Sequence, residues 1–430
     1  MEAVQGRRAG WTLADQAVSS LTNFGLSLAI ASTLDQVQFG AFAGAFLAYL
    51  LAMGAGRALL TEILAIRYAT AEPTMFRRVA AQAVGSSALF GVGAGALVAV
   101  FGFFVNQPLQ GALFTMVIAL PGLLAQDAWR FVFFAQGQPK NAAMNDGFWM
   151  AAQVMFVGIV FALGDADAAR LILAWGSSAW AATVFGAWQM GVIPDIGGAF
   201  RWVRESLQQG SRFLIGEWLA STGASRITEV VAGFILGLKE LAAYRGVGIL
   251  VGPLLVLFSG TSSFLVPEGS RIFERNPREL EGAIRKALLV LVGLSGVAIV
   301  VLVLMPDRIG ELLLGDTWPD ASELSLWVGL TLPSAAILNM SAVGLRVIAE
   351  MEQSLSLRLK TTPLLVSGVL LGAIVDGARG MVILSAITMF FASILWWRAS
   401  TRAVREAVQR AVAEAPLRRP PPEGDRSLPL

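Results

Sequence analysis

Long apolar runs recur along the whole chain and constrain its fold more than any other feature. A helix needs about 20 apolar residues to cross the ~30 Å hydrocarbon core of a bilayer. Runs of this length predict twelve membrane-spanning helices, at residues 11–31, 39–66, 79–105, 111–134, 147–163, 168–192, 213–236, 242–267, 287–305, 322–347, 362–375 and 381–397. The sequence therefore predicts an all-α polytopic membrane protein.

Composition excludes most soluble functions. Charged residues make up 14% of the chain and hydrophobic residues 56%, whereas about 25% of a soluble domain is charged. The chain has no His and no Cys, which rules out catalysis by imidazole or thiolate, disulfides, and zinc sites built on these ligands. We expect no enzyme activity, no metal and no cofactor.

The distribution of basic residues sets the predicted topology. With both termini inside, 24 of the 32 Lys and Arg residues fall on inner segments and five on outer segments, and the three in spans are Arg57, Arg130 and Arg226. This bias agrees with the positive-inside rule. It predicts cytoplasmic termini and explains the pI of about 9.2 without a nucleic-acid partner.

A weak internal repeat divides the chain. When the second half is moved back by 202 residues, Asp15 aligns with Glu217 and Ser19 with Ser221. We expect a six-helix lobe at 1–194, a cytoplasmic linker at 195–212, a second six-helix lobe at 213–399 and a mostly disordered tail at 400–430. Lobes with an even number of spans run in the same direction, which implies a pseudo-two-fold axis along the membrane normal. Residues 268–286 are predicted to form an interfacial or cytosolic helix.

Polar residues form a stripe on two equivalent spans. Asp15 and Asn23 belong to the stripe on the first span, and Glu217 and Glu229 to the stripe on the seventh. Ionisable residues inside a membrane usually face the interior of the bundle. Two such stripes predict a wet cavity, with interhelical hydrogen bonding in a tight bundle as the alternative.

Arg57 lies deep in the second span and needs a partner. Glu62 is five residues further on, about 140° around an ideal α-helix, and is a poor partner on that geometry. A guanidinium suits phosphate because it donates two parallel hydrogen bonds. Arg57 is therefore predicted to bind an anionic ligand or to pair with Asp15 or Glu217.

The other two intramembrane arginines have carboxylates three residues away. Arg226 precedes Glu229, and Arg130 follows Asp127. Such pairs can neutralise themselves, and phosphate contact is the alternative for both arginines. The intramembrane carboxylates, Asp15, Glu62, Asp127, Glu217 and Glu229, are candidates for cavity lining or for carrying a coupling proton, with permanent salt bridges as the alternative.

A glycine-rich run, residues 91–95 (GVGAG), lies in the middle of the third span. It is faintly similar to a dinucleotide-binding loop, but such a loop follows a strand. We interpret the run as a site of close helix packing.

The first two spans resemble a known family. Residues 15–20 (DQAVSS), 22–24 (TNF), 39–42 (FGAF) and 57–59 (RAL) are similar to the opening of bacterial polysaccharide-export proteins of the O-antigen and teichoic-acid flippase type. That superfamily also holds multidrug and toxin extrusion transporters and the peptidoglycan lipid flippase. The match covers roughly the first 65 residues. Span count, chain length and the repeat extend a looser resemblance to the rest.

The resemblance implies a transporter of the bacterial plasma membrane that alternates between inward-facing and outward-facing states. Its substrate would be a glycan on a polyprenyl pyrophosphate, whose tail stays in the bilayer. Arg57 and Arg226, with Arg130 and Asn23, would line the central cavity and contact the diphosphate and glycan. A polysaccharide polymerase or glycosyltransferases would be partners.

Two other functions remain open. The chain has few central arginines, and carboxylates accompany most of them. A proton- or sodium-coupled exporter of organic cations would instead use Asp15, Glu62, Glu217 or Glu229 for exchange. A glycan polymerase or ligase is the third possibility, but such membrane enzymes generally need a sizeable outer loop, and the predicted outer segments are short.

Overall fold

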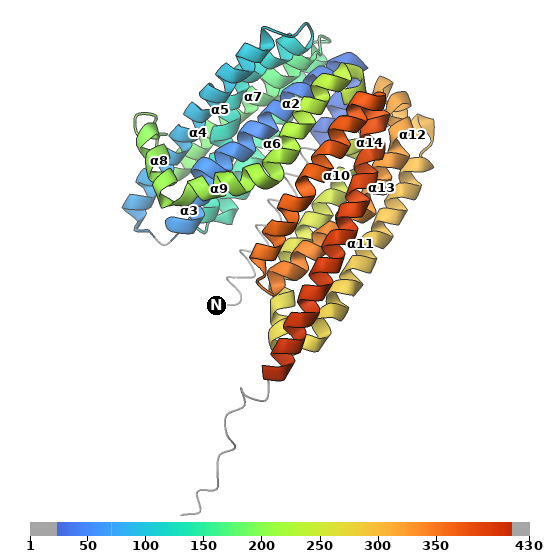
Figure 1. The fold of residues 1–430 in the computed structure, drawn as a ribbon. Coiled ribbons are helices and arrows are strands. Elements are labelled where there is room, and N and C mark those ends of the chain that lie inside the picture. Colours follow the sequence, from blue (N-terminus) through green and yellow to red (C-terminus); the bar gives the residue numbers. More distant parts are fainter. Residues whose placement is uncertain (1–23, 70, 415–430) are drawn as a thin grey trace, which may run out of the picture. The chain divides into compact units, whose positions relative to one another are not determined.

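The computed structural model describes residues 24–69 and 71–414, and every regular element within them is a helix (Figure 1). The α class predicted from the apolar runs is confirmed. In chain order the elements are Phe24–Thr33, α2 (Gln36–Gly56), η1 (Arg57–Thr61), α3 (Glu62–Arg67), α4 (Pro73–Gly102), α5 (Leu109–Ala135), α6 (Pro139–Ala162), α7 (Ala168–Met190), α8 (Ala199–Ser206), η2 (Leu207–Ser211), α9 (Arg212–Trp218), η3 (Leu219–Gly223), α10 (Ala224–Arg275), η4 (Pro277–Glu279), α11 (Leu280–Val303), α12 (Asp307–Leu314), η5 (Gly315–Thr317), α13 (Trp318–Val347) and α14 (Met351–Glu414).

Two of the long helices are each two spans. The described residues contain nine helices long and apolar enough to cross a membrane. The 64 residues of α14 would reach about 96 Å if straight, three times the hydrocarbon thickness. Non-helical backbone at Asp376 and Gly377 breaks α14, and Gly237 breaks α10 in the same way. With both breaks, the described part contains eleven segments that match predicted spans, and Phe24–Thr33 overlaps the end of the predicted first span, most of which lies outside the described residues.

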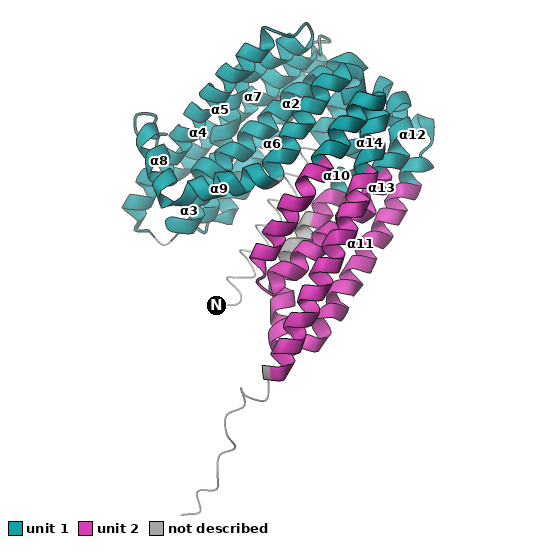
Figure 2. Ribbon diagram, viewed as in Figure 1, with its two compact units in different colours: residues 1–253, 301–328, 366–385 teal, residues 254–300, 329–365, 386–430 magenta. Residues whose placement is uncertain are grey.

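The chain divides into two compact units (Figure 2). The first consists of residues 1–253, 301–328 and 366–385, and the second of residues 254–300, 329–365 and 386–430. The predicted lobes, 1–194 and 213–399 with a linker between them, stay a prediction.

In the first unit, α5 is the central helix. It packs against α2, α4, α6 and α7, and its Trp129 and Phe133 are fully buried. Trp202 of α8 is also fully buried, and its indole N–H donates to the Leu60 carbonyl over 3.1 Å. Leu60 lies in the π-helical turn η1. The indole thus satisfies a carbonyl where the regular α-helical bonding of the span is interrupted.

Close packing of α4 on α5 depends on the glycine run. A Cβ atom at Gly91 would lie 2.6 Å from the Cα of Pro121, and one at Gly95 would lie 3.1 Å from the Val117 carbonyl oxygen. Gly93, by contrast, has open space where its Cβ would be. The interpretation of this run as a helix-packing site is confirmed, and Gly91 and Gly95 are the residues that make the contact.

The second unit has its own apolar core. Phe258 of α10, Leu291 of α11, Met340 of α13 and Val404 of α14 are buried together. On the outside, α11 has a mean hydropathy of 2.6 although only 17% of its most apolar window is buried. An apolar helix exposed in this way is suited to face lipid rather than water.

The separate helix predicted at residues 268–286 is absent from the described structure. Helix α10 continues to Arg275, and α11 begins at Leu280 after the single turn η4. Pro277 explains the break, because proline disfavours a helical conformation in the residue before it. Asn276 has a non-helical backbone (φ -147°, ψ 87°), and its side-chain Nδ2 donates to Glu279 Oε1 over 2.7 Å. The segment therefore consists of the ends of two long helices.

Candidate functional site

The intramembrane Arg57 forms a two-pronged ion pair with Asp127. Its Nε donates to one carboxylate oxygen over 2.7 Å and an Nη donates to the other over 2.5 Å. The guanidinium also lies 5.3 Å from the ring centroid of Phe131. Asp127 is on α5, whereas the partners predicted for Arg57 were Asp15 and Glu217. The pair joins the C-terminal end of α2 to α5, and fork-to-fork geometry makes it a strong contact.

A π-helical turn changes the position of Glu62. The Glu62 N–H bonds to the Arg57 carbonyl, which closes a turn of five residues. The two residues therefore lie one turn apart on neighbouring faces, and the predicted 140° separation is wrong because it assumed α-helical geometry. Glu62 lies within electrostatic range of both Arg57 and Glu217. Arg57, Asp127 and Glu62 are thus neighbours, and Glu217 of α9 lies within electrostatic range of Glu62.

A second polar cluster joins α5 to α6. Arg130 Nε lies 3.3 Å from Asp146 Oδ2, and the Gln126 amide donates to the other oxygen of Asp146 over 2.9 Å. Asn145 is fully buried beside them and donates to the Ala182 carbonyl over 3.0 Å. The sequence analysis assigned Asp127 as the partner of Arg130 and missed Asp146. Gln126 and Asn145 stand at similar distances before and after the turn at Gly137, and this spacing around a helical hairpin is the signal that could have revealed the cluster.

The predicted pair of Arg226 and Glu229 is confirmed. Arg226 Nη1 lies 2.8 Å from a Glu229 carboxylate oxygen. Arg245 lies within electrostatic range of both, and its guanidinium is 5.2 Å from the ring centroid of Phe46. The sequence analysis counted Arg245 among the outer-segment cations. Its position inside the span predicted at 242–267 could have identified Arg245 as an intramembrane residue.

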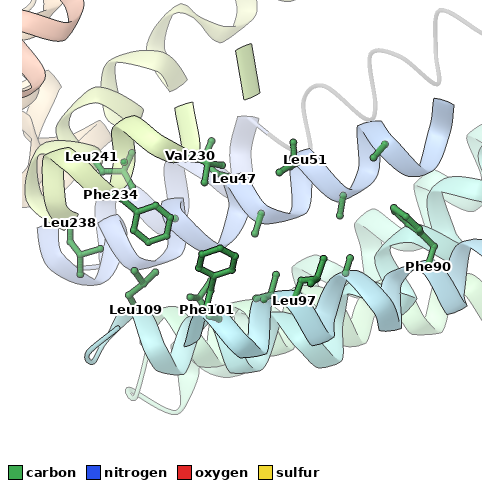
Figure 3. Close-up of a pocket in the computed structure, with 18 residues that line it drawn as sticks. Leu47, Leu51, Phe90, Leu97, Phe101, Leu109, Val230, Phe234, Leu238 and Leu241 are labelled. Atoms are coloured by element: carbon green, nitrogen blue, oxygen red, sulfur yellow. The ribbon is translucent and has the colours of Figure 1, made fainter. Parts of the chain in front are cut away.

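An apolar cavity of about 310 Å³ lies between α2, α4, α5 and the first part of α10 (Figure 3). All eighteen described residues that line it are apolar. They are Gly44, Leu47, Ala48, Leu51, Ala52, Ala55, Phe90, Ala94, Leu97, Val98, Phe101, Leu109, Leu113, Val230, Gly233, Phe234, Leu238 and Leu241. Its volume is at the lower end of the range for small-molecule sites, about 300–1,000 Å³. The sequence analysis did not predict this cavity.

Small residues on α2 leave the space. Gly44, Ala48, Ala52 and Ala55 follow at helical spacing and face α4 across the cavity. Phe90 of α4 lies near one end (Figure 3). Phe90 also lines a small polar pocket that contains Arg57 and Asp127. The apolar cavity and the ion pair are thus neighbours on either side of one phenyl ring.

The structure brings together four of the nine predicted site residues: Arg57, Glu62, Asp127 and Glu217. The Arg226 and Glu229 pair lies on α10, and Arg130 is on α5 in the neighbouring cluster. Asp15 and Asn23 lie outside the described residues. Within residues 24–69 and 71–414, acidic side chains form no group that could hold a metal ion.

Comparison with known proteins gives a clear result for structure only. A multidrug resistance MATE family transporter of the MOP superfamily, in an inward-facing conformation, superposes with a TM-score of 0.70 over 93% of this chain and 99% of its own, at 16% identity. The chain has the fold of the MATE transporters. Its described residues contain nine helices long and apolar enough to cross a membrane, so it is a multi-pass membrane protein.

Other structures with the MATE fold also superpose on this chain. An outward-facing MATE family transporter gives a TM-score of 0.57 over 94% of this chain and 96% of its own, at 15% identity. A MOP superfamily transporter from Pyrococcus furiosus, described as having a binding pocket of reversed polarity that suggests a different function, gives 0.54 over 94% and 96%, at 16% identity. No family model and no curated protein matches the sequence. The fold agrees with the one expected from the resemblance, and the superfamily and the polysaccharide-export subtype stay predictions.

Proposed function

We propose that the chain is an alternating-access transporter that exports amphipathic organic cations. This was the alternative in the sequence analysis, and it fits the described interior better than transport of a lipid-linked diphosphate. The supporting observation is that each predicted intramembrane cation is already bound by a carboxylate: Arg57 by Asp127, Arg130 by Asp146 and Arg226 by Glu229. A diphosphate would have to displace these carboxylates.

The charge balance around Arg57 favours a positive ligand. Arg57 is paired with Asp127, and Glu62 lies within electrostatic range of the same guanidinium, so two carboxylates accompany one guanidinium. Charges in a membrane interior are costly unless they are paired. A substrate cation would therefore find a partner here that a substrate anion would not.

Protonation of Glu62, next to the Arg57 and Asp127 pair, would release the ligand. A cation that binds beside Glu62 adds a positive charge close to Arg57, and a proton that binds Glu62 removes the negative charge that holds the cation. Intramembrane carboxylates commonly act in this way in proton-coupled transporters. We assign Glu62 as the exchangeable carboxylate and Asp127 as the residue that positions Arg57.

A lipid-linked oligosaccharide flippase is the second candidate. The open apolar cavity favours it, because a polyprenyl tail needs an apolar path beside the polar route of its headgroup. The paired arginines count against it. Under this reading the lipid-linked glycan would be the substrate, and a polysaccharide polymerase or glycosyltransferases would be partners.

The test is transport in proteoliposomes under an imposed pH gradient, with a fluorescent organic cation as cargo. We expect the wild-type protein to concentrate the dye and Glu62→Gln to lose most of that activity. Glu281→Gln is the matched control, because Glu281 pairs with Arg405 on the exposed surface of the second unit. Equal transport by Glu62→Gln and the control would refute the role of Glu62.

The same vesicles can distinguish the second candidate. A fluorescent polyprenyl-diphosphate oligosaccharide is added in place of the cation, and a membrane-impermeant quencher reports its arrival in the far leaflet. Protein-dependent movement of the glycolipid without uptake of the cation would replace the proposed function by the flippase.

A further inference from the structure

The apolar cavity is a site that neither the predicted residues nor the ion pairs explain. Its lining offers a ligand only aliphatic and aromatic carbon. Water needs two to four polar partners to occupy a cavity, and an apolar cavity of about 150 Å³ is known to stay dry and to bind small hydrocarbons. The cavity between α2, α4, α5 and α10, at about 310 Å³, is therefore suited to hydrocarbon rather than to water.

The rim of the cavity is open at the surface of the first unit and is apolar. Leu97, Phe101 and Phe234 line the cavity and are exposed by 67%, 57% and 52%. The rings of Phe101 and Phe234 stack with centroids 6.2 Å apart, at the end of the cavity away from Phe90 (Figure 3). These residues belong to apolar spans, so a flexible chain can enter sideways without crossing a polar surface.

The opposite end of the cavity approaches charge. Phe90 separates the cavity from the pocket that contains Arg57 and Asp127. Its ring edge also contacts Gly56, where an added Cβ would lie 3.4 Å from Phe90 Cδ1. A molecule with a charged head at the carboxylates and an apolar tail directed past Phe90 would meet matching chemistry along its whole length.

We propose that this cavity holds the hydrocarbon tail of the transported cation, so that the preferred substrates are single-tailed amphiphiles. The inference rests on the proposed function and adds the class of substrate. It assigns recognition of the head to the carboxylates around Arg57 and recognition of tail length to α2, α4 and α10.

The experiment compares binding of alkyltrimethylammonium ions, from butyl to hexadecyl, to the purified protein in nanodiscs. For the wild type we expect affinity to rise about fourfold for each methylene that enters the cavity, until the cavity is full. Ala94→Phe and Ala48→Phe place a ring inside the cavity, so the rise should stop several methylenes earlier while butyl binding stays unchanged. Because partition into the bilayer is the same for all variants, the wild-type-to-variant ratio isolates the cavity.

Ala96→Phe is the matched control. Ala96 is on the same helix as Ala94, is exposed, and does not line the cavity. It should behave as the wild type at every chain length. If the affinities of Ala94→Phe and Ala48→Phe also depend on chain length as in the wild type, the cavity does not bind the tail and the inference is wrong.

Two further results keep this inference separate from the proposed function. If the wild type binds neither short nor long cations, both the proposed function and the inference that rests on it are wrong. If cations bind but a photoactivatable lipid still labels Leu51 at saturating hexadecyl ion, a resident membrane lipid fills the cavity. That second result overturns the inference and leaves the proposed function standing.

Discussion

Helix α4 meets its two neighbours in opposite ways. On the side of α5, Gly91 and Gly95 bring the two backbones together, with no room for even a methyl group at Gly91. On the side of α2, Ala94 and Leu97 face a cavity of about 310 Å³ although small residues line both helices. Small side chains therefore close one interface and leave the other open.

Large rings at its ends explain why the second interface stays open. Phe90 stands at one end of the cavity, and the stacked Phe101 and Phe234 lie in its other half, next to Leu109 and Leu238. We interpret these rings as spacers between α4 and its neighbours α2 and α10, because the small residues between them leave the cavity open. Beyond Phe90, the Arg57 and Asp127 pair holds the C-terminal end of α2 against α5. A small-residue stripe thus predicts close approach only where no bulky residue acts as a spacer.

The largest effect is expected at the contact of α2 with α5, where Asp127 is removed from its ion pair with Arg57. Asp127→Ala leaves Arg57, whose side chain is only 28% exposed, without its two-pronged partner. Breaking one side of a buried pair costs about 3–5 kcal/mol, and we expect about 3 kcal/mol of lost unfolding free energy. Equilibrium unfolding in mixed detergent micelles measures it.

A double variant separates the unpaired charge from the lost contact. Arg57→Met combined with Asp127→Leu removes both charges and keeps apolar volume, so it should recover most of the stability. If Asp127→Ala alone lowers the unfolding free energy by less than about 1 kcal/mol, the pair does not hold the C-terminal end of α2 against α5. The proposed difference between the two interfaces of α4 would then no longer be supported by this pair.

The next largest effect is expected at the contact of α4 with α5. Gly91→Ala puts a methyl group 2.6 Å from the Cα of Pro121, so the helices must separate. Overpacking of this kind costs about 1–3 kcal/mol, and we expect about 2 kcal/mol in the same unfolding assay. A neutral result would show that α4 and α5 are less closely packed than the structure indicates.

The sequence was informative about features with local signals. Apolar runs give the spans whatever their partners are, and the glycine run identifies the packed face of α4. Arg226 and Glu229 were predicted as a pair because they are three positions apart on one helix. These signals need no knowledge of which helices are neighbours.

The rest depended on contacts between segments distant in the chain. Arg57 and Asp127 are 70 residues apart, and no local pattern relates them. The π-helical turn at Arg57 shifts Glu62 by a fraction of a turn, which ideal helix geometry cannot anticipate. The cavity is the clearest case, because it depends on how far Phe90 and Phe101 keep α4 from α2. Helical spacing alone gives no such distance.

Filling the open interface should stabilise the protein modestly. Ala94→Leu adds apolar volume to the cavity, and cavity-filling substitutions commonly yield about 0.5–2 kcal/mol. We expect about 1 kcal/mol of added unfolding free energy, because the new side chain replaces empty space. Ala96→Leu, on the exposed face of the same helix, should change stability by less than about 0.5 kcal/mol. Destabilisation by Ala94→Leu would indicate that the cavity is already filled.

The smallest effect should come from the third glycine of the run. Gly93 lies inside α4, and nothing among the described residues lies within 4 Å of where its Cβ would be. Gly93→Ala should therefore stabilise the protein by about 0.5–1 kcal/mol, because alanine restricts the unfolded chain and suits a helix interior. The sign is the decisive observation. Opposite signs at Gly91 and Gly93, two residues apart on one helix, would confirm that packing acts on one face of α4 only, whereas a loss at both would mean that a partner covers the second face as well.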